Sequence, residues 1–386
     1  MTETLAPEID SRDPASFPWS VFHHRHPVLI ERVANALPRP SAQRDALDAL
    51  LVESTSGVVT APDVESLRHE PWPWWRPEYR GVPWGETPFL WAESYFYRRI
   101  LDAVDYFVPG PWRGIDPYAP TKAAELAGHP VDEELAALDD LATRPLDEQW
   151  DALVRSSLWG NRADLSFQAG PSAGTGVGGV IADQTPAFRA LLHDRPAGAV
   201  HLIADNAGRE LLPDLILLDH LLDAGLATSV VLHVKPHPYY VSDATPADVL
   251  AAIARLGAAE GRASAVGERL AGFVRAGRLE LRAHEFFCGP LPYQAMPADL
   301  RAQFAEAALT ISKGDLNYRR LVGDRLWHPT APFAELTAHF PGPVVALRTL
   351  KCDVAVGLSA ATVEALDATG KAWRTTGEYA VVHVRA

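Results

Sequence analysis

Apolar residues in the first part of the chain recur every three or four positions. This spacing runs through 40–53, 90–106 and 132–157 and predicts amphipathic helices there. The segment 71–84 is rich in Trp and Pro and is predicted to be irregular. We find no strand-like alternation of useful length before residue 158, so this part is predicted to be helical.

The pattern changes after about residue 195. Short apolar runs now alternate with polar strings and amphipathic helices. The predicted strands are 199–204, 229–234, 278–283, 308–312 and 343–347. This alternation is typical of an α/β fold with a mostly parallel sheet and helices on both faces. We therefore expect a helical N-terminal domain or cap over 1–155 and a three-layer α/β/α domain over 156–386.

Four polar strings lie in the predicted turns between strands and helices. They are Asp205-Asn206, Ser242-Asp243, Lys313 to Arg319, and Arg348 to Lys351. In open parallel sheets, ligands bind beyond the carboxyl ends of the strands. The four strings together predict a polar site at that edge of the sheet.

Three of these residues offer only oxygen donors. Asp205, Asn206 and Asp243 suit a hard divalent ion such as Mg²⁺ or Mn²⁺ better than Zn²⁺, which prefers His or Cys. A few protein ligands leave coordination positions for water and a substrate oxygen. The alternative is that Asp205-Asn206 only caps the helix that begins near residue 209.

Positive side chains occupy the neighbouring turns. Lys313, Lys351, Arg319 and Arg348 could neutralise phosphate oxygens, and Gly314 could let backbone N–H groups approach the anion. The chain has five lysines against 30 arginines, so two lysines in equivalent turns suggest a need for a compact charge.

Surface ion pairing is the alternative for both lysines. Lys313 could pair with Asp315, and Lys351 with Asp353, at little gain in stability.

Composition and missing motifs exclude several classes of function. The formal charge of −14 and the lack of a basic stripe argue against nucleic acid or an anionic membrane as partner. Cys288 and Cys352 lack zinc-site or redox spacing, and no 18-residue apolar run occurs. P-loop and G-x-S-x-G motifs are absent. We expect a cytoplasmic protein.

Two other strings are not predicted to have a role in function. Residues 174–179 fit G-x-G-x-x-G, but Gly170-Pro171 stands where a strand is needed, so a loop is predicted. His23-His24-Arg25-His26 is interpreted as a solvated polar turn.

The polar strings together resemble a known family. They are SLWGNRADLS at 157–166, DNAG at 205–208, VSD at 241–243, KGDLNYR at 313–319 and RTLK at 348–351. With WAESYFYRR at 91–99, they are similar to the damage-control phosphatase family. RTLK looks like the Arg-Thr-x-Lys motif of its acidic-residue methyltransferase-like subfamily.

The resemblance implies a helical region packed on an α/β/α sandwich and a metal-dependent phosphatase acting on small phosphorylated metabolites. Sugar phosphates such as fructose 1-phosphate are among them, and the metal would be Mn²⁺, Mg²⁺ or Co²⁺. Carried over by position, the implied metal ligands are Asp205, Asn206 and Asp243; the first two would also face the substrate. The implied substrate and phosphate contacts are Asp315, Asn317, Tyr318, Arg319 and Lys351.

Two alternatives remain open at this stage. Members of the subfamily have also been described as carboxyl methyltransferases that use S-adenosylmethionine, and a sugar-phosphate binding protein without turnover would use the same ligands. Oxygen ligands for a hard metal beside lysines favour phosphate hydrolysis, because a methyl donor needs neither.

Overall fold

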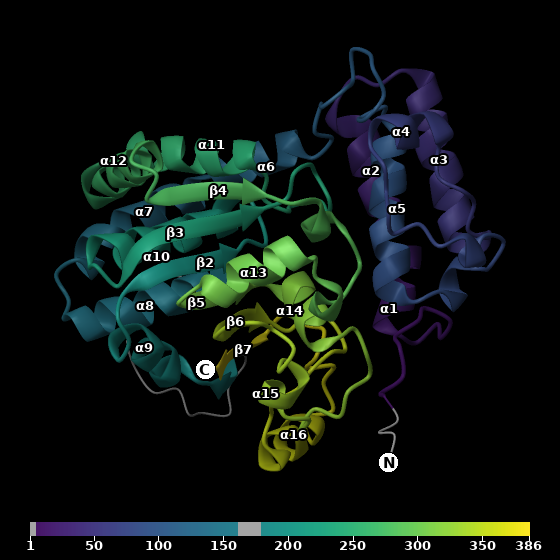
Figure 1. Ribbon diagram of the computed structural model, residues 1–386. Coiled ribbons are helices and arrows are strands. Elements are labelled where there is room, and N and C mark those ends of the chain that lie inside the picture. Colours follow the sequence, from purple (N-terminus) through teal and green to yellow (C-terminus); the bar gives the residue numbers. More distant parts are fainter. Residues whose placement is uncertain (1–4, 161–178) are drawn as a thin grey trace.

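The computed structural model describes residues 5–160 and 179–386, and within them the strands form one seven-stranded sheet (Figure 1). Its order is β1-β7-β6-β5-β2-β3-β4. The strands are β1 (Gly179–Asp183), β2 (Gly198–Ile203), β3 (Ala227–Val234), β4 (Leu279–Ala283), β5 (Leu309–Lys313), β6 (Val344–Thr349) and β7 (Tyr379–Arg385). Only the β6–β7 pairing is antiparallel, so the predicted mostly parallel sheet is confirmed.

Helices surround this sheet, and the helices of residues 17–103 form an N-terminal lobe beside it (Figure 1). The α-helices are α1 (Phe17–Ser20), α2 (His26–Ala36), α3 (Ser41–Ser56), α4 (Val64–His69), α5 (Phe89–Ala103), α6 (Ala119–Leu126), α7 (His129–Leu141), α8 (Leu146–Trp159), α9 (Thr185–His193), α10 (Leu211–Asp223), α11 (Pro246–Gly257), α12 (Gly261–Arg275), α13 (Ala298–Glu306), α14 (Asp315–Val322), α15 (Phe333–Leu336) and α16 (Ala360–Asp367). The remaining turns are the π-helical η1 (Val21–Arg25) and the 3₁₀ turns η2 (Pro77–Tyr79), η3 (Trp84–Glu86), η5 (Gly208–Glu210), η6 (Glu285–Cys288) and η7 (Tyr293–Ala295).

Alternating side chains of the strands build two cores, one on each face of the sheet. On β6, Val345 and Leu347 pack with the helices α7 to α12, whereas Val344 and Ala346 pack with the opposite layer. That opposite layer contains α13 and α14, and the same core continues into the N-terminal helices α2, α3 and α5 beside the sheet. The period-two pattern of the strands thus gives the predicted three-layer arrangement.

The five strands predicted from sequence match β2 to β6 to within two residues. β1 and β7 were not predicted; they add to the edge beyond β6 and run opposite to the central strands. After β6 the chain forms no helix until α16 begins at Ala360.

The single helix predicted over 132–157 is wrong in detail. It is two helices, α7 and α8, and the second begins directly after Pro145, whose ring disfavours helical geometry in the residue before it. Both helices share the core of α10 to α12. The division at residue 155 stays a prediction.

The histidine string is also not a solvated turn. His26 is buried and stacks on Phe96 with ring centroids 3.7 Å apart, and burial lowers its pKa well below the usual value. His23 contacts the carbonyl oxygens of Trp19 and Thr55 through its two ring nitrogens. Pro27 cannot donate a backbone hydrogen bond, and the chain before it forms the wider π-helical turn η1.

The strand order places a switch point between β2 and β5. From β2 the chain goes to β3 and β4 on one side, then returns to β5 and β6 on the other. Connections after β2 and β5 therefore leave in opposite directions, which opens a crevice at their carboxyl ends.

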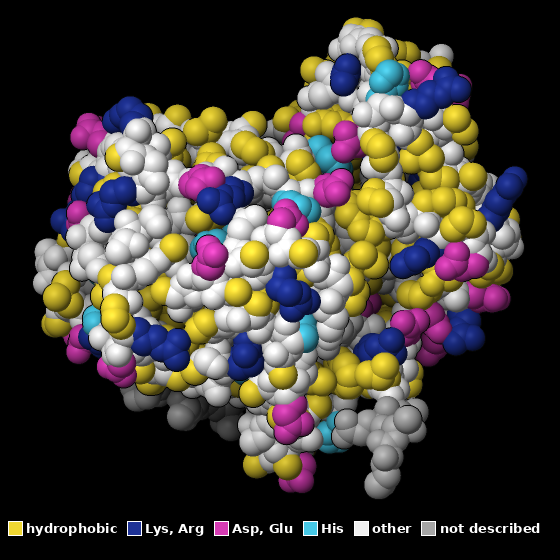
Figure 2. Space-filling view, viewed as in Figure 1, with side chains coloured by type: hydrophobic (Ala, Val, Ile, Leu, Met, Phe, Trp, Pro, Cys, Tyr) yellow, Lys and Arg dark blue, Asp and Glu magenta, His cyan; other side chains and the backbone are white. Residues whose placement is uncertain are grey.

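The surface adds two observations. On the face shown in Figure 2, positive and negative side chains are interspersed, with no continuous basic area. No helix in the described part of the chain is long and apolar enough to cross a membrane.

Candidate active site

Two adjoining cavities lie at the carboxyl ends of β2, β5 and β6, with volumes of about 450 and 520 Å³. Phe17, Arg25, Asp205 and Lys351 line both. Lys313 and Gly314 line the first cavity; Asn206, Asp243, Asp315 and Arg319 line the second. The four polar strings therefore do meet at one edge of the sheet.

Backbone pairing brings the three predicted metal ligands together. Asn206 and Asp243 form an isolated antiparallel bridge, and the N–H of Ala244 donates to the carbonyl oxygen of Asp205 at 2.9 Å. The Ser242 hydroxyl donates to Oδ1 of Asn206 at 2.8 Å. The connection after β3 is thus folded back onto the end of β2.

Lys122 on α6 anchors this connection from the other side. Its Nζ donates to the carbonyl oxygen of Asp243 at 3.0 Å and pairs with Asp116 and Asp248. Thr245 and Asp248 form a capping box at the start of α11. Lys122 could not be assigned from sequence, because 121 residues separate it from Asp243.

Asp205 lies in an acidic environment. Burial, and then the negative charges of Asp243 and Glu210, raise its pKa to about 7, although Lys351 and Lys313 act in the opposite direction. The sequence did not indicate Glu210 as a residue of the site. It accepts a hydrogen bond from Nδ2 of Asn206 at 2.7 Å, and its four-residue spacing from Asn206 is what could have indicated it.

The donor set fits a hard cation but does not by itself form a metal site. Within residues 5–160 and 179–386, no three carboxylates, imidazoles or thiolates are grouped so as to hold a metal ion. Asp205 and Asp243 repel each other at the cavity wall, with the amide of Asn206 beside them. A divalent cation would relieve this repulsion.

Lys313 is held by a partner that the sequence did not indicate. Its Nζ contacts both carboxylate oxygens of Asp214 on α10, at 2.9 and 3.2 Å, and both side chains are almost fully buried. The Ser157 hydroxyl donates to the same carboxylate at 2.6 Å. Burial would lower the pKa of Lys313, but the charge of Asp214 raises it, so the ammonium stays charged.

We expect Asp214→Ala to destabilise the fold by about 3–5 kcal/mol, because it leaves the Lys313 ammonium buried and unpaired. Urea unfolding would measure this loss. The double variant Lys313→Met/Asp214→Leu should recover most of it, since no charge is then buried. Equal stability of the single and double variants would contradict this account.

Gly314 occupies a position that only glycine fits. Its φ of +88° is strained for other residues, and a Cβ there would lie 2.0 Å from the Asp205 carboxylate. Its N–H donates to the carbonyl oxygen of Leu347 at 2.8 Å. The chain after β5 therefore passes directly against Asp205.

Gly314→Ala is expected to lose about 1–3 kcal/mol of stability through backbone strain. It should also lower kcat/KM by at least about 10²-fold, because Asp205 must move. Gly323→Ala is the matched control: its φ is +89°, but its added Cβ would meet only Trp327, at 3.7 Å. The control should lose stability alone; equal loss of activity in both variants would contradict the role of Gly314.

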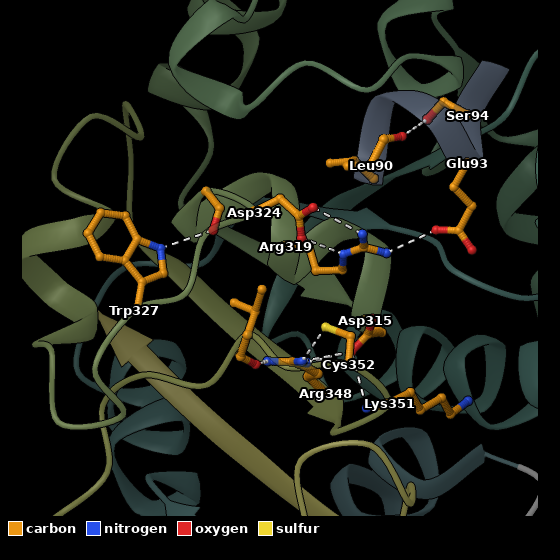
Figure 3. Close-up of polar contacts among 12 residues, drawn as sticks. Leu90, Glu93, Ser94, Asp315, Arg319, Asp324, Trp327, Arg348, Lys351 and Cys352 are labelled. Carbon is orange, nitrogen blue, oxygen red and sulfur yellow. Dashed lines mark hydrogen bonds and ion pairs between the residues drawn. The ribbon is translucent and has the colours of Figure 1, made fainter. Parts of the chain in front are cut away.

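Arg319 and Asp315 lie four residues apart on α14 and both line the second cavity. Arg319 lies between Asp324 and Glu93, with contacts of 2.7 and 3.2 Å (Figure 3). Burial would raise the pKa of Asp315, but the charges of Arg348 and Arg319 hold it below its usual value. These charges are therefore fixed by partners within the protein.

Three predicted substrate contacts lie behind the cavity walls. Arg348 donates to Asp315 at 2.8 Å and to the carbonyl oxygen of Val354. Asn317 donates to the carbonyl oxygens of Ala204 and Lys313, and the Tyr318 hydroxyl contacts His383. None of the three lines either cavity. Their contact with a substrate stays a prediction.

Lys351 is exposed, and its side chain extends away from the Arg348 cluster in Figure 3. Its backbone N–H donates to Asp315 at 3.3 Å, whereas its ammonium has no ion pair in the described part of the chain. The alternative pairing of Lys313 with Asp315 is wrong, since Lys313 pairs with Asp214. The predicted loop 174–179 lies outside the described residues except for Gly179, which begins β1, and so do residues 161–166 of the string 157–166.

Comparison with known proteins gives a consistent result. The model of the damage-control phosphatase ARMT1-like domain matches residues 21–366. Damage-control phosphatase ARMT1 of Danio rerio is 34% identical over 333 residues, covering 78% of this chain and 74% of the relative. That of Rattus norvegicus is 32% identical over 329 residues, covering 77% and 74%.

A solved structure was also matched. The crystal structure of a DUF89 family protein from Pyrococcus horikoshii aligns over 90% of this chain and 94% of that chain, with a TM-score of 0.49 and 14% identity. The resemblance predicted from the polar strings is confirmed by the family match and the relatives. The chain belongs to the damage-control phosphatase ARMT1-like family.

Proposed function

We propose that this protein is a metal-dependent phosphomonoesterase that acts on small phosphorylated metabolites, sugar phosphates such as fructose 1-phosphate among them. One observation carries the proposal. The acidic pair Asp205 and Asp243 and the ammonium of Lys351, which has no ion pair within residues 5–160 and 179–386, line adjoining cavities at the switch point of the sheet. A metal–phosphate ligand needs negative and positive walls of this kind.

In this proposal, Asp205, Asn206 and Asp243 hold Mn²⁺, Mg²⁺ or Co²⁺. When bound, such an ion polarises the phosphoryl group and lowers the barrier to attack on phosphorus. The protein's own task is to keep these oxygens in place, which the Asn206–Asp243 bridge and Lys122 support.

Lys351 binds the phosphoryl oxygens on the opposite wall. A flexible ammonium can follow the oxygens as charge builds in the transition state. Asp315 and Arg319 line the second cavity and are available to the sugar hydroxyls, while Lys313 supports the positive wall from beneath, held by Asp214.

Donor chemistry favours phosphate over a methyl donor. S-adenosylmethionine carries a sulfonium cation and requires no metal, whereas this site combines hard oxygen donors with the ammonium of Lys351. The proposal retains the cytoplasmic location expected from the sequence.

A paired assay tests the proposal. A panel of sugar phosphates and other phosphomonoesters is incubated with and without Mn²⁺, and phosphate release and methyl transfer from S-adenosylmethionine are scored in the same samples. Metal-stimulated phosphate release without methyl transfer is the expected result. Metal-independent methyl transfer, with no phosphate released from any ester, would overturn it.

A further inference from the structure

Arg25 is a cation from the N-terminal lobe that reaches the site. It is the last residue of the π-helical turn η1, it is exposed, and it lines both cavities together with Phe17. One-turn π-helices occur often at functional sites. Here the turn precedes Pro27 and directs a residue far in sequence from the sheet toward Asp205 and Lys351.

The guanidinium of Arg25 has no hydrogen-bond or ion-pair partner among residues 5–160 and 179–386. Among these residues it makes a cation–π contact with Phe17, whose ring centroid lies 6.0 Å from Cζ of Arg25. Lys313 is paired with Asp214, Arg319 with Glu93 and Asp324, and Lys122 with Asp116 and Asp248. Arg32 lines the second cavity alone and does not reach the first. Arg25 and Lys351 are the unpaired cations of the described chain that line both cavities.

The balance of charges in the site suggests a role for Arg25 and Lys351 together. Two carboxylates, Asp205 and Asp243, cancel a divalent ion, so the two negative charges of a phosphomonoester still need two positive partners. Lys351 supplies one. Glu210, at the wall of the first cavity, adds negative charge rather than removing it. A second cation at the junction of the cavities would balance the remaining charge of the phosphate.

We propose that Arg25 binds the phosphoryl oxygens of the substrate, so that the N-terminal lobe supplies part of the anion site. This inference rests on the proposed function. The planar guanidinium can donate two parallel hydrogen bonds to a phosphate, which a lysine cannot do. Arg25 thus complements Lys351. Arg25 fixes the orientation of the phosphoryl group, and the flexible Lys351 stays close to its oxygens as their charge builds.

The test compares Arg25→Ala and Arg25→Lys with Arg44→Ala. Arg44 is an exposed arginine on α3 of the same lobe that lines neither cavity. Measured quantities are kcat and KM for fructose 1-phosphate with Mn²⁺, the Ki of inorganic phosphate, and the unfolding midpoint. Activity is measured again with guanidinium chloride at tens of millimolar as a diffusible replacement.

We expect Arg25→Ala to lower kcat/KM and weaken phosphate inhibition by about tenfold or more, at an unchanged unfolding midpoint. Arg25→Lys should recover only part of the loss, Arg44→Ala should stay within about twofold of the unmodified protein, and guanidinium should rescue Arg25→Ala alone. Normal kinetics in Arg25→Ala, or a loss that follows a lowered unfolding midpoint without rescue, would overturn the inference.

Failure of the proposed function would be recognised separately. If the unmodified protein releases phosphate from no ester, calorimetry with Mn²⁺ and inorganic phosphate still tests Arg25. Weaker phosphate binding by Arg25→Ala than by Arg44→Ala would support the anion site, and equal binding by the two would overturn it.

Discussion

Asp205→Ala and Asp243→Ala are each expected to lower kcat/KM by on the order of 10³-fold or more. Each removes one of the two carboxylates that we assign to the divalent ion. A chelator should abolish phosphate release by the unmodified protein, and Mn²⁺, Mg²⁺ or Co²⁺ should restore it. The expectation follows from the oxygen donors that the Asn206–Asp243 bridge brings together.

The fold should survive both substitutions, because removing one acid relieves the repulsion that raises the pKa of Asp205. Thermal unfolding with and without Mn²⁺ gives a readout independent of activity. The ion should raise the midpoint of the unmodified protein and have little effect on either variant, since ligands stabilise only the state that binds them.

Asp48→Ala is the matched control for these variants. Asp48 is an exposed carboxylate on α3, away from both cavities, so its loss should change neither turnover nor the Mn²⁺ response. Full phosphatase activity in Asp205→Ala or Asp243→Ala, or in excess chelator, would refute the metal assignment.

The elements around the site could be predicted because local sequence determines them. β2 is an apolar run that ends where Asp205 begins, and a parallel sheet places all such ends at one edge. Knowing that β2 and β5 both end there was enough to expect Asp205 and Lys313 near each other. No information on side-chain partners was needed for that step.

The direction of side chains on α14 was not predicted. Asp315 and Arg319 are one helical turn apart and share the cavity face, while Asn317 and Tyr318 point into the core. Residues 315–319 form the first turns of α14, so their side chains cannot all face one cavity. A helix that begins at Asp315 places Asp315 and Arg319 on one face and Asn317 and Tyr318 on another.

Contacts between distant segments could not be predicted at all. The buried pairing of Lys313 with Asp214 joins residues 99 apart, and Arg25 enters the site from another lobe. No sequence spacing predicts either contact, because both depend on how whole layers of the fold pack together. The same holds for Lys122 and the carbonyl of Asp243.

Lys351 carries the second large expected effect. It follows β6 at the junction of the cavities, and its ammonium has no ion pair in the described chain. We expect Lys351→Met to lower kcat/KM by on the order of 10²-fold or more, because one positive charge that we assign to the phosphoryl oxygens is lost. Since no buried contact is broken, the free energy of unfolding should change by less than about 1 kcal/mol.

Lys351→Arg separates charge from shape. Arginine keeps the positive charge but brings a longer, planar head, which would displace either the substrate or a neighbouring ligand of the site. If the compact ammonium is what the phosphoryl group needs, this variant also loses activity, and Lys371→Met, at an exposed lysine that lines neither cavity, does not. If Lys351 only faces solvent and never contacts the phosphoryl group, both Lys351 variants should keep near-normal kinetics. Near-normal turnover in Lys351→Met would therefore refute its contact with phosphate, whatever the arginine variant shows.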